Sequence, residues 1–172
     1  MHEHAYAVPA RRPAVLFVDS EPSVKSLAPA LRSSFTVTAH SDLDAARGAL
    51  TQIHPTLLIL DAELAGANAA ALCRDAKAAT SAPAILVTTD DVRTVPALLA
   101  AGCDGVLLKP YPPHLLYMRI QRMLHRPAAE VPAQVCPRCG HPGATWFEFA
   151  SHRRAWYACL ACNEVWLTKL VR

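Results

Sequence analysis

The chain lacks the long apolar run that a membrane-spanning helix requires. No hydrophobic stretch approaches the roughly 20 residues needed to cross a bilayer, and Asp19 interrupts the first apolar stretch too early for a secretory signal peptide. Internal repeats and low-complexity tracts are missing too. We therefore expect a globular, cytoplasmic protein without a membrane partner.

A marked excess of charge of one sign is also missing. The formal net charge is +3, and both parts of the chain are close to balance: residues 1–126 carry 12 Lys and Arg against 11 Asp and Glu, and residues 127–172 carry 5 against 3. A surface that binds nucleic acid usually shows a basic patch. The composition therefore gives a nucleic-acid partner only weak support.

The length and the hydrophobic pattern indicate one domain followed by a smaller module. A chain of 172 residues has room for a domain of about 120 residues and a small satellite. Short, continuous apolar runs rich in Leu and β-branched residues are typical of strands buried on both faces of a parallel sheet. Such runs occupy residues 14–18, 35–38, 57–60, 85–87 and 106–108. Segments typical of helices occupy residues 22–33, 43–53, 69–79, 92–101 and 113–124.

The alternation of strand and helix predicts an α/β fold with a doubly wound, five-stranded parallel sheet, because crossovers between parallel strands are right-handed. Helix boundaries agree with it: Pro22 suits a first helical turn, and Gly102 follows the fourth helix. Candidate caps are Ser41, Asp42 and Asn68. We assign residues 1–13 to an N-terminal tail, 14–125 to this domain, 126–135 to a linker and 136–172 to the second module.

Polar side chains follow four of the five predicted strands. They are Asp19, Ser20 and Glu21 after the first strand, Asp61 after the third, Thr88 after the fourth and Lys109 after the fifth. The carboxyl ends of parallel strands meet at one edge of the sheet, where such folds place their active crevice. We expect these residues to form one site.

At these positions the chain resembles the receiver domains of two-component response regulators. The resemblance covers residues 14–125 and rests on the segments VLFVDSEP, LLILDAELAG, ILVTTDD and AGCDGVLLKPY, in the family's order and spacing. It implies a flavodoxin-like receiver fold and a role in phosphorelay signal transduction, with a histidine kinase or phosphotransfer protein as partner. It implies no enzyme activity beyond the domain's own phosphorylation and dephosphorylation.

The resemblance also assigns roles to individual residues. Asp61 is the expected nucleophile, which takes a phosphoryl group and forms an aspartyl phosphate. Lys109 is expected to neutralise charge on the phosphoryl oxygens, and Thr88 to hydrogen-bond the transferred group. Mg²⁺ prefers hard oxygen ligands; those implied are Asp19, Asp61 and the backbone carbonyl of Glu63.

Three residues depart from the family's pattern. Ser20 stands where a second acid usually follows the first strand, Ala65 stands where a proline is usual, and Val106 replaces the aromatic switch residue of the fifth strand. Ser20 is expected to lower the affinity for Mg²⁺, because Glu21 is expected to face outward. The alternative to a phosphorylated regulator is therefore a degenerate receiver that serves as a scaffold.

Four of the six cysteines form two C-x-x-C pairs near the C-terminus. A segment of 19 residues separates Cys136 and Cys139 from Cys159 and Cys162, and four thiolates are a ligand set typical of a structural Zn²⁺ site. A module of about 37 residues is too small to fold by apolar burial alone, so zinc is expected to supply most of its folding free energy.

The sequence around these cysteines resembles the zinc ribbons of transcription elongation factors and RNA polymerase small subunits, over residues 136–167. Alternating bulky and polar residues predict hairpin strands at 145–151 and 153–159 and a third strand at 164–170. The aromatic residues of these strands are expected to form the ribbon's own core. The hairpin tip lacks the acidic pair of transcript-cleavage factors, so cleavage activity is not implied.

Two classes of function stay open for the ribbon. It could bind a protein target, as the interaction module of a phosphorylation-controlled regulator, or it could contact DNA or RNA polymerase as a transcriptional effector. Homodimerisation through the face built from residues 92–124 is open as well. The remaining cysteines, Cys73 and Cys103, lie in apolar surroundings and are expected to be small core residues.

Overall fold

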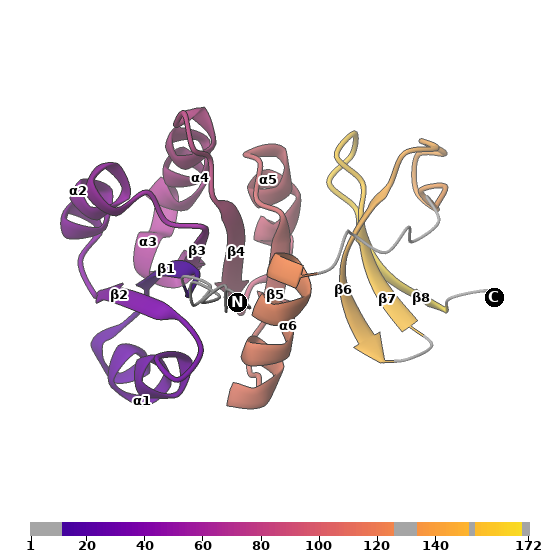
Figure 1. The fold of residues 1–172 in the computed structure, drawn as a ribbon. Helices are drawn as coiled ribbons and strands as arrows, with labels where there is room; N and C mark the ends of the chain where they lie inside the picture. The colour runs from indigo at the N-terminus through magenta and orange to yellow at the C-terminus, as the bar shows by residue number, and fades with distance from the viewer. Residues whose placement is uncertain (1–11, 126–133, 152–153, 170–172) are drawn as a thin grey trace, which may run out of the picture.

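Two β-sheets organise the computed structural model, which describes residues 12–125, 134–151 and 154–169. The first sheet has five strands in the order β2-β1-β3-β4-β5, and all its neighbouring strands are parallel (Figure 1). Its strands are β1 (Ala14–Val18), β2 (Thr36–His40), β3 (Leu57–Asp61), β4 (Ala84–Thr89) and β5 (Gly105–Leu108). The predicted doubly wound parallel sheet is confirmed.

Helices cover both faces of this sheet (Figure 1). They are α1 (Glu21–Leu31), α2 (Leu43–Ile53), α3 (Ala62–Ala65), α4 (Ala69–Ala78), α5 (Val95–Ala100) and α6 (Pro113–His125), with the 3₁₀ turns η1 (Gly66–Asn68) and η2 (Val92–Thr94) before α4 and α5. In the described ranges no helix combines the length and the apolar character needed to cross a membrane.

The continuous apolar strands result from burial on both faces. Side chains along a strand point alternately to opposite faces. In β3, Leu58 and Leu60 belong to the buried cluster that includes α2, α4 and α5, whereas Leu57 and Ile59 belong to the cluster with α1 and α6. A polar residue within such a strand would lie in one of these clusters, so polar residues are confined to the strand ends.

The strand register brings the carboxyl ends together at one edge. Asp61, the last residue of β3, pairs with Thr88 of β4. Strands β1 and β5 end one residue before Asp19 and Lys109. The four positions that the sequence indicated are therefore neighbours at this edge.

Two local differences from the sequence prediction have clear causes. The segment 92–101, predicted as one helix, divides into η2 and α5, because the Asp91 carboxylate accepts a hydrogen bond from the Arg93 backbone N–H at 2.9 Å and the Asp91 carbonyl accepts one from Thr94 Oγ1 at 2.8 Å. Helix α3 was not predicted. It begins directly after Asp61, whose carboxylate accepts a hydrogen bond from the Glu63 N–H at 3.0 Å and so caps it.

The second sheet is antiparallel, with the order β6-β7-β8, and comprises β6 (Thr145–Ser151), β7 (Arg154–Ala158) and β8 (Val165–Lys169). Its three strands agree with the prediction. Residues 1–11 of the expected tail, 126–133 of the expected linker and 152–153 at the hairpin tip lie outside the described residues. Gln134, also assigned to the linker, forms an isolated bridge with Ala144.

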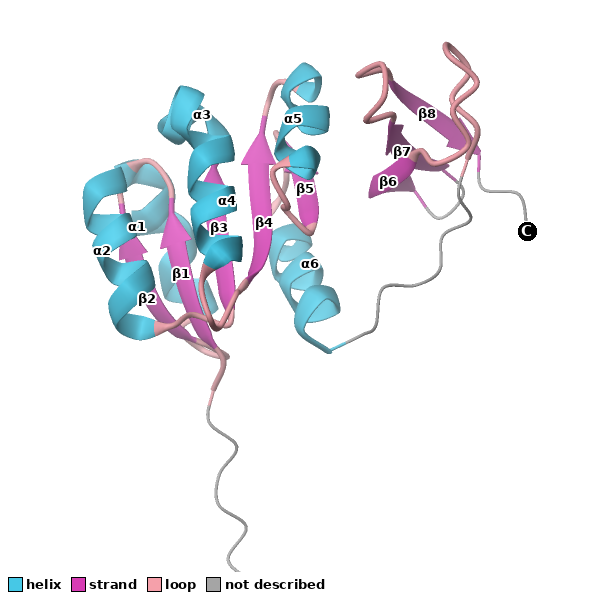
Figure 2. Ribbon diagram, turned by 90° about the horizontal axis from the view of Figure 1, so that it is seen from above, coloured by secondary structure: helices cyan, strands magenta, loops and turns pink. Residues whose placement is uncertain are grey.

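This three-stranded module packs against the side of the larger domain formed by β5, α5 and α6 (Figure 2). Strand β6 has a register shift between Trp146 and Glu148, and Phe147 between them is only 1% exposed. Phe147 belongs to the same buried cluster as Val95 and Leu98 of α5. The two parts of the chain therefore share a hydrophobic core.

The aromatic residues predicted to form the ribbon's own core are accordingly divided between two environments. Tyr157 and Trp166 stack within the module, with ring centroids 5.7 Å apart, and belong to its own small cluster. Phe147 and Trp156, with centroids 6.4 Å apart, pack against the core of the larger domain.

Arg119 of α6 forms a polar link between the two parts. Its side chain donates a hydrogen bond to the Phe147 carbonyl and lies 5.3 Å from the centre of the Trp146 ring, as does the Arg122 guanidinium. Cations over an aromatic face are attracted by its quadrupole. Gly105 leaves room for this arrangement, because a Cβ at that position would lie 3.2 Å from Arg119 Nη2.

Candidate functional site

Two buried carboxylates lie at the carboxyl edge of the parallel sheet. Asp61 is 5% exposed and Asp19 is 1% exposed. Asp19 accepts a hydrogen bond from the Ser20 N–H at 2.6 Å, and Asp61 accepts one from the Glu63 N–H in the first turn of α3. Buried carboxylates are costly unless they are paired or ligate a cation, so this edge is a candidate for charge-dependent chemistry.

Lys109 supplies the cation of the site. Its Nζ lies 2.8 Å from Asp61 Oδ1 and 2.8 Å from Glu63 Oε2, so one ammonium group bridges two carboxylates. The structure thus brings Asp19, Asp61 and Lys109 together as expected. It adds the Glu63 side chain, whereas the sequence had indicated only the backbone carbonyl of this residue.

The Glu63 carboxylate reaches from α3 to the end of β4. Glu63 Oε1 accepts a hydrogen bond from Thr89 Oγ1 at 2.6 Å and another from the Asp90 N–H at 3.0 Å. In the sequence, the position of Glu63 two residues after Asp61 is the only signal for its contacts with Thr89 and Asp90. The partners on β4 could not be identified without the fold.

Thr88 lies at the same edge and is 0% exposed. Its hydroxyl is buried and has no hydrogen-bond partner of ordinary geometry among the described residues, although it lies close enough to the Tyr111 hydroxyl to offset part of the rise that burial causes in the pKa of Tyr111. Buried hydroxyl groups are normally satisfied, and an unsatisfied one next to Asp61 fits a site that is completed by another polar group.

Burial and neighbouring charges shift the pKa values of the central groups. Burial raises the pKa of Asp61, with further upward contributions from Glu63 and Asp19 that outweigh the lowering by Lys109. For Lys109 burial alone would lower the pKa, but its hydrogen bonds to Asp61 and Glu63 raise it above the ordinary value. Lys109 is therefore held as a cation within the site.

The residues present fit a magnesium ion in their chemistry. The carboxylates of Asp61 and Glu63 share one ammonium group, and that of Asp19 lies beside Asp61. Three carboxylates and one ammonium leave a formal charge of −2 that a divalent cation would neutralise. Ser20 contributes no acid, and its hydroxyl bonds Ser23 Oγ at 3.1 Å instead.

Glu21 does not replace the missing acid. Its side chain is 67% exposed and forms an ion pair with Lys25 at 2.6 Å. The expectation that Glu21 faces outward agrees with this geometry.

The four C-terminal cysteines form a second candidate site. The Sγ atoms of Cys136, Cys139, Cys159 and Cys162 all lie within 4.8 Å of one another. The distance between Cys136 Sγ and Cys162 Sγ is 3.6 Å, and that between Cys139 Sγ and Cys159 Sγ is 3.7 Å. A tetrahedral Zn²⁺ site with Zn–S bonds of about 2.3 Å separates its sulfurs by about 3.8 Å. The cluster is compatible with a zinc ribbon.

Both C-x-x-C loops have the same backbone structure. In each loop, the carbonyl of the first cysteine accepts a hydrogen bond of 2.9 Å from the backbone N–H of the residue four positions later. The backbone N–H of the same cysteine donates a hydrogen bond to the carbonyl of the residue five positions later, at 2.9 Å in the first loop and 2.8 Å in the second. Gly140 and Asn163 occupy the matching positions with φ of 73° and 61°. Gly and Asn tolerate this left-handed conformation, so each sequence favours the loop even before a metal binds.

The other polar candidates do not join these sites. His141 is exposed and lies outside the cysteine cluster, and His152 is outside the described residues. Cys73 and Cys103 are buried as expected, and burial raises the pKa of the Cys73 thiol to about 11. They are inert core residues.

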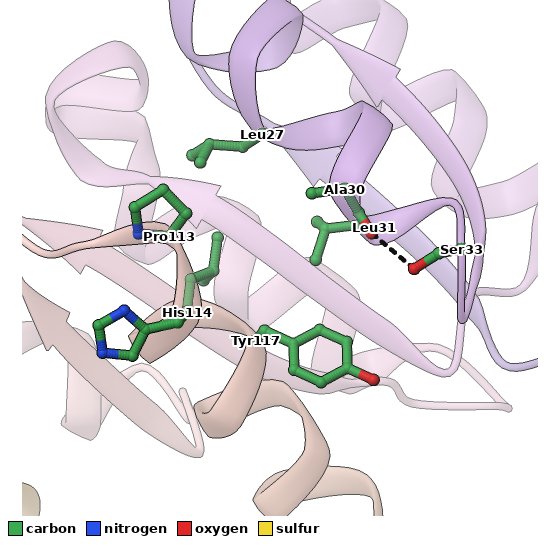
Figure 3. Close-up of a pocket in the computed structure, with 8 residues that line it drawn as sticks. Leu27, Ala30, Leu31, Ser33, Pro113, His114 and Tyr117 are labelled. Carbon is green, nitrogen blue, oxygen red and sulfur yellow. Dashed lines mark hydrogen bonds between the residues drawn. The ribbon is translucent and has the colours of Figure 1, made fainter.

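A separate groove of about 280 Å³ lies between α1 and α6 (Figure 3). Leu27, Leu31 and Tyr117 form its apolar walls, and the Tyr117 hydroxyl lies 3.0 Å from Ser34 Oγ. No acidic side chain is among the described residues that line it. The groove is therefore distinct from the carboxylate edge.

The sheet order and this edge define the class of the larger domain. A five-stranded parallel sheet in the order 2-1-3-4-5, with Asp19, Asp61, Thr88 and Lys109 at one edge, is the arrangement of a response-regulator receiver domain.

The comparisons with known proteins support this assignment, although no family model matches the chain. The chain is 32% identical over 117 residues to the protein PetR of Rhodobacter capsulatus, a match that covers 66% of this chain and 49% of PetR. It is 33% identical over 119 residues to the DNA-binding response regulator MtrA of Mycolicibacterium smegmatis, covering 67% and 52%. The chain thus spans about half the length of these curated relatives.

A solved structure agrees with the fold. The response regulator receiver protein from Burkholderia phymatum is 27% identical, has a TM-score of 0.56, and matches 67% of this chain and 98% of its own. The chain contains a receiver domain of the response-regulator family.

Proposed function

We propose that this protein is a phosphorelay response regulator that accepts a phosphoryl group on Asp61 from a histidine kinase or phosphotransfer protein in the cytoplasm. The observation that carries the proposal is the buried Asp61 carboxylate with Lys109 Nζ 2.8 Å from its Oδ1 and Asp19 beside it. A carboxylate can attack a charged phosphoryl group only where cations offset the repulsion.

Each residue of the edge has a definite task in this reaction. An Asp61 oxygen forms the new P–O bond as the P–N bond of the donor's phosphohistidine breaks and its electron pair returns to the imidazole. Lys109 offsets charge on the phosphoryl oxygens, and the Thr88 hydroxyl gains an acceptor in the transferred group. Asp19, Asp61 and the Glu63 carbonyl would hold Mg²⁺, which supplies further positive charge to the reacting phosphoryl group.

We also propose that the four cysteines bind one structural Zn²⁺ and that the ribbon passes the signal to a protein target. Support comes from the sulfur–sulfur distances and from the burial of Phe147 in the cluster that includes residues of α5. Thr89 and Thr94 Oγ atoms, 3.3 Å apart, connect the end of β4 to the start of α5. A change at the carboxylate edge therefore has a short route to the ribbon.

The first test is phosphorylation in vitro. Acetyl phosphate or phosphoramidate with Mg²⁺ is expected to add one phosphoryl group to the wild-type chain, read by intact mass. The adduct is expected to be absent from Asp61→Ala and retained by Asp75→Ala, which removes an exposed acid of α4. An adduct that persists in Asp61→Ala, or none on the wild type with either donor, would identify a different acceptor or a degenerate scaffold, respectively.

A second candidate function is transcriptional, with the ribbon contacting DNA or RNA polymerase. It is favoured by the name of the relative MtrA, a DNA-binding response regulator. On the ribbon itself Arg138 already pairs with Glu164 at 3.4 Å. We expect no DNA binding at low salt in a fluorescence-anisotropy titration. Binding that weakens steeply as salt rises would instead support the transcriptional role.

A further inference from the structure

The Glu63 carboxylate occupies a set of donors suited to an anion. It is bonded by Lys109 Nζ at 2.8 Å, by Thr89 Oγ1 at 2.6 Å and by the Asp90 N–H at 3.0 Å. These donors come from the ends of two neighbouring strands, β4 and β5. An ammonium, a hydroxyl and a backbone amide together are the groups that proteins use to bind phosphate.

The same ammonium group serves Asp61. Lys109 Nζ is 2.8 Å from Asp61 Oδ1 and 2.8 Å from Glu63 Oε2. A phosphoryl group on Asp61 would place additional anionic oxygens within reach of Lys109 and beside the Glu63 carboxylate. Like charges at contact distance in a partly buried site repel strongly, so the two anions compete for one cation.

We propose that Glu63 is a built-in substitute for the phosphoryl group: in the unphosphorylated protein it holds the donors of Lys109, Thr89 and Asp90, and phosphorylation displaces it. The second part, that phosphorylation displaces Glu63, rests on the function proposed for Asp61. The first part, that Glu63 holds these donors in the unphosphorylated protein, rests on the geometry alone.

Displacing Glu63 would free the segment that leads into α5. Thr89 Oγ1 accepts a hydrogen bond from the Asp91 N–H at 3.1 Å and lies 3.3 Å from Thr94 Oγ1. Thr94 is the residue before α5, the helix that shares a buried cluster with Phe147 of the ribbon. In this proposal the Glu63 side chain of α3 is the group that moves on phosphorylation. The position of the aromatic switch residue on β5 is taken by Val106, which is fully buried.

Two measurements test the two halves separately, on the full zinc-loaded chain. The first is the dissociation constant of beryllofluoride at saturating Mg²⁺, from calorimetry. Glu63→Gln keeps the size of the side chain and its acceptor oxygen but removes the charge. It is expected to tighten beryllofluoride binding about tenfold. Glu21→Gln, which changes an exposed acid at the same carboxyl edge of the sheet, is the matched control and is expected to change nothing.

The second measurement is hydrogen–deuterium exchange of segment 88–94, in the wild type and Glu63→Ala without ligand and in the wild type with beryllofluoride. Exchange there is expected to be several-fold faster in Glu63→Ala than in the wild type, and beryllofluoride is expected to produce the same rise in the wild type. A purely structural ion pair would alter thermal stability without changing beryllofluoride affinity.

The outcomes separate the inference from the proposed function. Unchanged affinity in Glu63→Gln together with unchanged exchange in Glu63→Ala, while the wild type binds beryllofluoride, overturns the role of Glu63 and leaves Asp61 as acceptor. Absence of beryllofluoride binding in every variant refutes the phosphoacceptor function, and faster exchange in Glu63→Ala would then still support the holding role.

Discussion

Replacing Cys159 with serine is expected to abolish metal binding and to unfold the three-stranded module. Cys159 is 0% exposed, and its Sγ lies 3.7 Å from that of Cys139. Structural zinc contributes about 10–16 kcal/mol to the folding of small domains. Among the residues that the structure describes, the module's own cluster contains only the buried side chains of Ala144, Ala155 and Tyr157, which is too little apolar burial to replace the metal.

Metal analysis and circular dichroism check this prediction. The wild type is expected to hold one zinc per chain, and Cys159→Ser none, with loss of the antiparallel sheet signal. Cys103→Ala, which removes a buried thiol outside the cluster, is the control and is expected to keep its zinc. A Cys159→Ser protein with a full complement of zinc would show that the four thiolates are not the ligand set.

Replacing Phe147 with alanine is expected to separate the ribbon from the receiver domain without releasing zinc. Phe147 is 1% exposed and lies in the cluster of Val95 and Leu98, and Phe→Ala in a core costs about 3–5 kcal/mol. The four zinc ligands are untouched. The substitution is therefore expected to destabilise the contact between the ribbon and the receiver domain rather than the zinc site.

Thermal unfolding and small-angle scattering measure this effect. Phe147→Ala is expected to unfold at lower temperature, to expand in solution and to keep one zinc per chain. Leu167→Ala, on the 37% exposed position of β8, is the matched control and should behave as wild type. Compact Phe147→Ala protein with an unchanged melting temperature would mean that the shared core contributes little.

The sequence predicts the strands and the acidic edge well for a simple physical reason. A strand covered by helices on both faces must be apolar throughout, so polar residues such as Asp61 are confined to its ends, and parallel strands bring those ends together. The cysteine cluster is equally predictable from the sequence, because C-x-x-C spacing is typical of paired metal ligands.

Two features of the molecule cannot be predicted from the hydrophobic pattern or from the spacing of the cysteines. The reach of the Glu63 side chain to Thr89 depends on a rotamer and on a strand 26 positions further along the chain. The burial of Phe147 in the core that it shares with α5 coincides with a local register shift in β6. An alternating aromatic strand looks the same in sequence whether its large side chains fill the ribbon or fill a neighbouring domain.

The position of the ribbon also bears on the oligomeric state. The face for which homodimerisation is an open question, residues 92–124, includes α5 and α6, and the ribbon packs against both (Figure 2). While Phe147 and Arg119 hold the ribbon in place, a second copy has no access to the covered part of that face. Dimerisation through it would require the ribbon to leave first.

Strand β5 is the last strand of its sheet, and the three-stranded module lies along that side (Figure 2). An open sheet edge offers unpaired backbone groups to other molecules and invites aggregation. If the cysteines hold zinc as proposed, a chain without the metal would lose this cover, and with it the Phe147 side chain that shares a buried cluster with Val95 and Leu98. The zinc supply of the cell would then govern how long the protein stays in solution, independently of any signal it carries.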